Sequence, residues 1–146
     1  DPPAPAGEAR AVEKVRIAYR PDRAATALLL VGWLASRLGW TEGHASTGGD
    51  TLRFRGAPGK PVTVSLRKDT RAPDPIGGIE LYAAGGRYAV SFHGASVVLE
   101  TPGIAWKDPW SVRPDAELWA AALGAAGRDP LYVTALEEIA PVLRSL

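Results

Sequence analysis

The chain has 146 residues, of which 46% are hydrophobic and 23% are charged, which is the composition of one folded domain. Seventeen Lys and Arg against sixteen Asp and Glu give a formal net charge of +1. This balance argues against the overall basic field that nucleic-acid and membrane-surface binding proteins use. The absence of Cys excludes disulfides, thiolate metal sites and a cysteine nucleophile. No apolar run approaches the ~20 residues that cross a bilayer.

The start of the chain differs in composition from the rest. Residues 1–9 are rich in Pro and Ala and lack periodicity, so they predict a linker or disordered arm. Residues 10–146 predict a single α+β domain. A linker-like start without Met indicates a domain cut from a longer chain. The lack of Cys favours an intracellular protein.

A strand and a long helix are predicted next. Apolar and polar residues alternate over 14–20, which is typical of a half-buried strand. Asp22 is a suitable N-cap for a helix that ends at Leu38. Gly39 stands where a left-handed residue closes a helix, and Trp40 is expected to fold back on the last turn. Leu34 lies on the apolar stripe of this helix and is predicted to be in the core.

The middle of the chain predicts an antiparallel meander. Residues 41–50 form a polar, Gly-rich loop. Short alternating segments joined by Gly-containing turns then predict the strands 52–55, 62–67, 79–82, 88–92 and 97–100. The segment 102–113 is predicted to be an irregular loop.

Two further helices are predicted near the end. Pro114 suits the first helical position of a helix that stops near Gly124. Asp129 and Pro130 repeat this pattern for a third helix, which Pro141 should kink or end. The order of elements predicts an α+β fold, a mostly antiparallel sheet of about five to six strands with three helices packed on one face.

The sequence contains no recognisable catalytic motif. The run GAPGKP over residues 56–61 lacks the Ser or Thr and the helix of a phosphate-binding loop, so it predicts a turn. There is no G-x-G-x-x-G fingerprint and no G-x-S-x-G elbow. His44 and His93 have no metal-ligand spacing. We therefore predict no enzyme activity, no catalytic residue, no cofactor and no metal.

Five arginines project from the polar faces of predicted strands or their ends. They are Arg16, Arg20, Arg53, Arg55 and Arg67. If these strands are neighbours, the arginines form a local basic stripe. This stripe is either a solvated sheet face or a docking surface for an acidic protein or a phosphorylated ligand.

Two tryptophans, Trp106 and Trp110, lie in the predicted loop 102–113. A loop tryptophan commonly covers the core of its own domain. At a protein surface it is a favoured anchor of an interface. The sequence leaves both roles open.

Three segments carry a family resemblance. They are AATALLLVGWLASRLGW at 24–40, GGIELYAAGGRYAVSFHG at 77–94 and RPDAELWAAALGAAGRDPLYVTAL at 113–136. In these blocks and their order, the chain resembles the C-terminal region of the OpcA family, the glucose-6-phosphate dehydrogenase assembly proteins.

The resemblance implies a cytoplasmic, non-enzymatic protein whose partner is glucose-6-phosphate dehydrogenase. Such a protein assembles or allosterically activates the enzyme and supports the oxidative pentose phosphate pathway. The resemblance also implies an N-terminal domain that this chain lacks. Arg37, Trp40, Arg53 and Arg55 are our candidate partner contacts. The alternative is a small-ligand (sugar-phosphate) binding or enzymatic domain that uses the polar sheet face.

Overall fold

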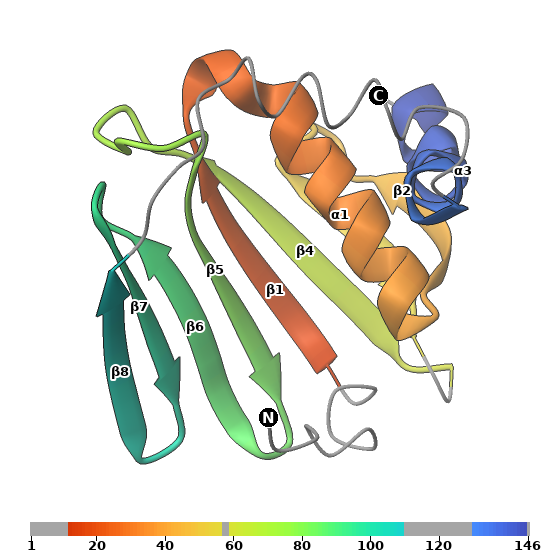
Figure 1. Cartoon of the computed structure of the whole chain (residues 1–146). Coiled ribbons are helices and arrows are strands. Elements are labelled where there is room, and N and C mark those ends of the chain that lie inside the picture. The colour runs from red at the N-terminus through yellow and green to blue at the C-terminus, as the bar shows by residue number, and fades with distance from the viewer. Residues whose placement is uncertain (1–11, 57–58, 110–129, 146) are drawn as a thin grey trace.

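The computed structural model describes residues 12–56, 59–109 and 130–145. Two helices lie on one side of a twisted sheet (Figure 1). In chain order the elements are β1 (Val12–Tyr19), a 3₁₀ turn (Pro21–Arg23), α1 (Ala24–Leu38), β2 (Thr41–Ala45), β3 (Thr51–Arg55), β4 (Pro61–Lys68), β5 (Ile76–Ala83), β6 (Gly86–Phe92), β7 (Ser96–Thr101), β8 (Ile104–Pro109) and α3 (Pro130–Ser145). The predicted arm 1–9 and the predicted helix 114–124 lie outside the described residues.

The described residues form a sheet of eight strands in the order β2-β3-β4-β1-β5-β6-β7-β8. Neighbouring strands run antiparallel except β1 and β4, which pair in parallel because the chain crosses over through α1 and the β2–β3 hairpin. The predicted α+β class is therefore confirmed, with two helices among the described residues. The predicted five to six strands are too few, and the sheet is mixed.

The two additional strands form the two edges of the sheet. β2 falls in the segment predicted as a polar loop. Gly43 allows β2 to pack closely against Phe54 of β3 and Val142 of α3. A Cβ at position 43 would lie 2.5 Å from Cε1 of Phe54 and 2.9 Å from Cγ2 of Val142. β8 falls in the predicted loop 102–113. Pro102 and Gly103 form the turn before it, and Gly103 has the positive φ of 89° that such a turn requires.

The start of α1 differs from the prediction, whereas its end confirms it. A 3₁₀ turn precedes α1, and the N-cap is Arg23, without a side-chain cap. Asp22 is not the N-cap because its carboxylate accepts two hydrogen bonds from Arg20, from Nε at 3.0 Å and Nη2 at 2.9 Å. At the other end Gly39 is left-handed, with φ 69°, and Trp40 N–H donates to the Ala35 carbonyl at 2.8 Å.

α3 continues through Pro141 to Ser145, so the prediction that Pro141 could end it is wrong. The proline ring removes one N–H, whose acceptor would be the carbonyl of the exposed Glu137. Ile139 and Val142 are buried and hold this stretch against the core. Ser145 Oγ donates to the Val142 carbonyl at 2.7 Å and accepts from Ala45 N–H of β2 at 2.8 Å.

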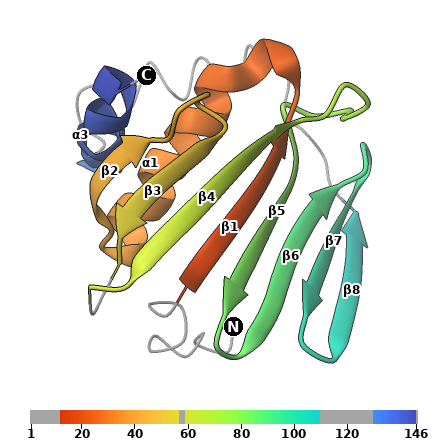
Figure 2. The same cartoon turned by 180° about the vertical axis from the view of Figure 1, so that it is seen from behind.

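Both helices cover the same face of the sheet, over β1 to β4 (Figure 1). α3 packs against α1 and β2. Leu34 is buried, as predicted, together with the other members of the core: Val12, Val15, Ile17, Tyr19, Ala27, Val31, Ala35, Trp40, Leu52, Phe54, Val62, Val64, Ile139 and Val142. Neither helix covers the opposite face, which is seen from behind in Figure 2. That face carries the candidate functional site.

Candidate functional site: the uncovered polar face

Strand alternation assigns the residues of the uncovered face. Val15, Ile17, Leu52, Val62 and Val64 point into the core, so the residues between them point away from the helices. The strand pairings extend this assignment over β5, β6 and β7. The uncovered polar face consists of Lys14, Arg16, Ala18, Arg53, Arg55, Thr63, Ser65, Arg67, Gly78, Glu80, Tyr82, Arg87, Ala89, Ser91, Val98 and Glu100.

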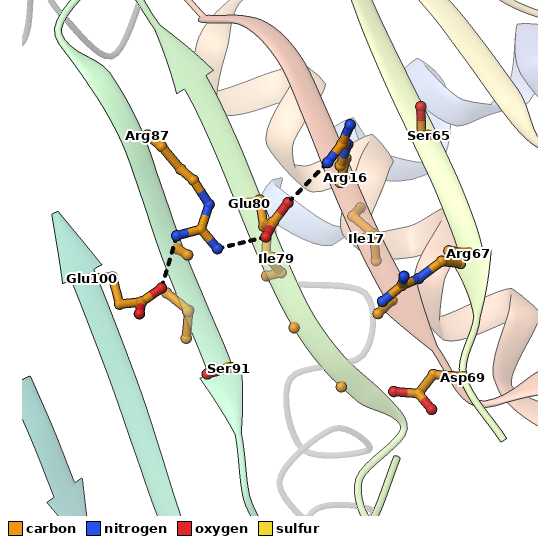
Figure 3. Close-up of a pocket in the computed structure, with 15 residues that line it drawn as sticks. Arg16, Ile17, Ser65, Arg67, Asp69, Ile79, Glu80, Arg87, Ser91 and Glu100 are labelled. Carbon is orange, nitrogen blue, oxygen red and sulfur yellow. Dashed lines mark hydrogen bonds and ion pairs between the residues drawn. The ribbon is translucent and has the colours of Figure 1, made fainter. Parts of the chain in front are cut away.

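A network of charged side chains crosses four strands of this face. Arg87 donates from Nη2 to Glu80 Oε1 at 2.6 Å and from Nη1 to Glu100 Oε2 at 2.9 Å. Arg16 Nη1 lies 3.7 Å from Glu80 Oε2 and donates to the Tyr82 hydroxyl at 3.3 Å. Tyr82 in turn donates to Glu80 at 2.9 Å. These contacts form an alternating row of charges across β1, β5, β6 and β7 (Figure 3).

The network shifts the pKa values of two of its members. Hydrogen bonds from Arg87 hold the pKa of Glu80 below its ordinary value, and those from Tyr82 add to the effect. The carboxylates of Glu80 and Glu100 raise the pKa of Arg87 above its already high value. Glu80 and Arg87 therefore stay charged at neutral pH and hold each other in place.

A hollow of about 550 Å³ lies beside this network (Figure 3). Its floor consists of residues with short or absent side chains, Ala18, Gly78 and Ala89. A Cβ on Gly78 would lie 3.1 Å from the carbonyl oxygen of Val90, so the close approach of β6 favours glycine there. The polar side chains around the floor are Arg16, Ser65, Arg67, Asp69, Glu80, Arg87, Ser91 and Glu100. Three cations and three carboxylates therefore surround a small-residue floor.

Several cations of the face have no carboxylate partner among the described residues. Arg53 and Arg67 are exposed and form no ion pair there. Lys14 lies 5.9 Å from the ring centroid of Tyr82 and forms no ion pair within that part of the chain. Arg55 differs, because its Nε lies 2.9 Å from Glu42 Oε2 of β2. The β3–β4–β1 side of the face therefore carries unneutralised positive charge.

The structure brings together most of the arginines that the sequence singled out. β3, β4 and β1 are neighbours, so Arg16, Arg53, Arg55 and Arg67 share one face. Arg20 pairs with Asp22 after the end of β1. The basic stripe is confirmed for four of its five members.

The four candidate partner contacts lie in different layers. Arg53 and Arg55 are exposed on the uncovered polar face, and Arg37 is exposed on α1 in the helix layer. Trp40 is only 1% exposed and packs on Phe54 with ring centroids 5.6 Å apart. Its burial removes Trp40 from the surface, since the residue that folds back on a helix end packs into the core. Arg37, Arg53 and Arg55 are therefore exposed but lie on two different surfaces, so Arg53 and Arg55 mark one predicted docking surface and Arg37 marks another.

The histidines form no metal site in the described part of the chain. His44 Nδ1 lies 3.3 Å from the Glu42 carbonyl, and no group of three metal-ligating residues occurs among the described residues. His93 Nε2 lies 3.0 Å from Ser91 Oγ. Within residues 12–56, 59–109 and 130–145 no hydrogen bond joins the other ring nitrogen of His93 to a carboxylate, which would orient it as a general base.

Sequence reasoning missed the acidic half of the network. Glu80 and Tyr82 alternate with Ile79 and Leu81, which signals that they share a face. Their pairing with Arg16 and Arg87 depends on the strand register, which the sequence did not supply.

The helix-side face of the sheet extends beyond the helices. Trp106, predicted in a loop, lies on β8 opposite Leu99 of β7 and is 48% exposed. Leu99 and Ile104 are 36% and 55% exposed. Nearly half of the Trp106 surface is therefore exposed. Trp110 lies outside the described residues.

Neither described helix has the length and apolar character needed to cross a bilayer.

Comparisons with solved structures find distant similarity. The chain matches an oxidoreductase from Sinorhizobium meliloti with 16% identity and a TM-score of 0.46, covering 95% of this chain and 55% of that one. It matches the UDP-N-acetylglucosamine 3-dehydrogenase GnnA from Acidithiobacillus ferrooxidans with 12% identity and a TM-score of 0.45, covering 94% and 55%. It also matches a super-repressor mutant of Gal80p from Saccharomyces cerevisiae with 11% identity and a TM-score of 0.41, covering 92% and 55%. The chain spans about half the length of these proteins.

A comparison with curated proteins finds no match. A comparison with protein families does find one. Residues 1–136 match the OpcA family domain, which is described as the C-terminal domain of a glucose-6-phosphate dehydrogenase subunit. This match covers nearly the whole chain and confirms the family predicted from its sequence blocks. The chain therefore belongs to the OpcA family of C-terminal domains.

Proposed function

We propose that this chain is a non-catalytic domain that binds glucose-6-phosphate dehydrogenase and promotes its active oligomer. It thereby supports the oxidative pentose phosphate pathway, and it acts in the cytoplasm, as the family resemblance implies. The observation that carries this proposal is the family match over residues 1–136. A broad charged face that no described helix covers is compatible with a protein partner.

The mechanism is differential binding. A protein that binds the active conformation or oligomer of an enzyme more tightly than the inactive one shifts the population toward the active form. A coupling free energy of ~1–3 kcal/mol changes the apparent affinity for substrate by about 5–150-fold. The domain needs no catalytic group of its own for this effect.

The uncovered polar face is our candidate docking surface. Arg53 and Arg67 are exposed without an ion-pair partner among the described residues, so an acidic patch on the partner would neutralise them. Arg53 and Arg55 remain predicted contacts at the β3 side of this face. Arg37 lies in the helix layer, so a flat partner surface that contacts Arg53 does not also contact Arg37. Arg37 marks the competing docking surface.

The test combines the dehydrogenase from the same source with the full natural protein that contains this domain. Sedimentation velocity measures the oligomer, and initial rates measure the apparent KM for glucose 6-phosphate. We expect a larger particle and a lower KM, and we expect both effects to weaken as salt screens the charges. An unchanged sedimentation profile together with unchanged kinetics at micromolar protein would contradict the proposal.

Two charge reversals locate the surface. Arg53→Glu should weaken the association at least about tenfold, because it places a negative charge against an acidic patch. Arg37→Glu makes the same charge change in the helix layer and should leave the affinity unchanged. The opposite result would assign docking to the helix layer, and equal losses would indicate a dependence on net charge alone.

The competing hypothesis is a small-ligand or enzymatic domain, and the hollow in the polar face supports it. An enzyme would convert a substrate with the dehydrogenase absent, which product detection by mass spectrometry tests directly. Ligand binding without turnover is compatible with partner binding, because the hollow occupies only part of the face.

A further inference from the structure

We propose that the hollow is a binding site for a small phosphate monoester, with its phosphate held between Arg16, Ser65 and Arg67. This inference goes beyond partner binding, and it applies to the domain by itself. It depends on which side chains of the hollow already have partners and which do not.

On the β5–β7 side of the hollow, the charged side chains already have hydrogen-bond partners within the domain. Arg87 uses both terminal nitrogens on Glu80 and Glu100, at 2.6 and 2.9 Å. Glu80 also accepts from Tyr82 at 2.9 Å. This part of the wall is held rigidly, and its two carboxylates leave no cation free for a ligand.

The near side carries free donors. Arg67 forms no ion pair or side-chain hydrogen bond within the described residues, and neither does Ser65. Arg16 uses a single nitrogen, Nη1, for its contacts with Tyr82 and Glu80. Because an arginine has five N–H donors in a planar fork, most donors of this pair remain available to a bound oxyanion.

The strand register places these donors on neighbouring positions of the same face. Arg16 of β1 lies opposite Ser65 of β4, and Ala18 lies opposite Arg67. Arg16 and Arg67 are therefore diagonal neighbours on the same face, a separation that long side chains span. Figure 3 shows the side chain of Arg67 lying across from β4 toward β1, below Ser65 and Arg16. Arg67 therefore lies beside Ala18, and Arg16 and Ser65 face each other one residue pair further along the same face.

The other residues that line the hollow indicate the chemistry of the part of the ligand that is not phosphate. Ala18, Gly78 and Ala89 leave room above the sheet, and the volume of about 550 Å³ suits a small metabolite. Asp69 and Ser91 line the same hollow and offer groups that hydrogen-bond to hydroxyls. A phosphate at the arginine side and a polyhydroxy carbon skeleton over the floor match this arrangement. The ligand class is therefore a phosphorylated polyol or sugar.

Isothermal titration calorimetry on the isolated chain tests the site with three probes: inorganic phosphate, glucose 6-phosphate and glucose. We expect saturable binding of glucose 6-phosphate at submillimolar concentration, weaker binding of phosphate and none of glucose. Equal binding of glucose and its phosphate would contradict recognition of the phosphate. No heat with any probe at 10-millimolar scale would reject the site, whether or not the chain binds the dehydrogenase.

Matched variants show whether glucose 6-phosphate binds to the hollow itself or is attracted by the overall positive charge of the face. Arg67→Gln should weaken glucose 6-phosphate at least about tenfold, since it removes charge-assisted hydrogen bonds. Arg53→Gln removes the same charge from the same face outside the hollow and should leave binding unchanged. Equal losses in both variants would overturn the proposal. Arg67→Lys keeps the charge without the planar fork, and an intermediate loss with that variant supports recognition by the fork.

Discussion

The two faces of this sheet arise from the same strands and serve different purposes. In β1, Val15 and Ile17 are fully buried beneath α1, whereas Arg16 between them is exposed on the other side. One face stabilises the fold through apolar burial. The opposite face carries charges whose partners lie on neighbouring strands. The difference indicates that the helix-side residues contribute most of the burial that stabilises the fold, whereas the polar face is the one on which we propose binding.

The helix-side face is itself divided. Over β1 to β4 the helices cover it, and the side chains there are buried. Over β7 and β8 the same face exposes Leu99, Ile104 and Trp106. Apolar residues in the two parts therefore contribute differently to stability although their alternation is the same.

The largest expected loss of stability tests whether the helix-covered and the exposed parts of this face differ in burial. Leu34→Ala should reduce the free energy of unfolding by about 2–5 kcal/mol, because it leaves a cavity in the core. Leu34 is 7% exposed. Leu99→Ala is the matched control and should cost less than about 1 kcal/mol, since Leu99 is already 36% exposed. Urea unfolding measures both variants, and similar losses would mean that the two parts of the face are equally buried.

The sequence predicted the central strands because period-two alternation is a local signal. The strands at 14–20, 52–55, 62–67, 79–82, 88–92 and 97–100 all appear, with shifted ends. The two edge strands were missed. β2 has few apolar residues, because it presents Gly43 to Phe54, and β8 follows a Pro-Gly turn whose significance was overlooked. Edge strands need only one partner, so their sequences are less constrained.

The candidate site was predicted in part for the same reason. Alternation places Arg16, Arg53 and Arg67 on polar faces, and the strand order then unites them. The pairing of Glu80 with Arg87 is a contact between strands, and no local pattern specifies its register. Trp40 is predicted both to fold back on the last turn of α1 and to contact a partner. The left-handed Gly39 turns its indole into the core, which confirms the first prediction and removes Trp40 from the surface.

A smaller loss of stability is expected for changes at Gly39, which ends helix α1. Gly39→Val should destabilise the protein by about 1–3 kcal/mol, because a β-branched residue is strained at φ 69°. A Cβ at this position would meet no atom within 4 Å, so the cost is conformational and not steric. Gly39→Asn should cost less, since Asn tolerates the left-handed region. Thermal unfolding compares the two variants, and equal losses would point to a cause other than backbone conformation.

The smallest expected effect lies on the polar face. Glu80→Gln should cost about 1 kcal/mol at pH 7, because ion pairs that remain in contact with solvent contribute little. The pKa of Glu80 is lowered from 4.5 in the folded state by hydrogen bonds from Arg87 and Tyr82, so folding favours its charged form. That stabilisation is present above pH 4.5 and is lost as pH falls through the lower folded-state pKa. The difference in stability between the wild type and Glu80→Gln should therefore shrink on acidification.

Urea unfolding at a series of pH values from 7 to 3 measures this difference. Glu13→Gln is the matched control, because Glu13 is exposed and its side chain forms no hydrogen bond or ion pair with any other described residue. Its difference from the wild type should stay near zero at every pH. A loss for Glu80→Gln that matches Leu34→Ala would show that the charge network is part of what holds the fold together. The two faces would then share the structural role that we assign to the helix-covered face alone.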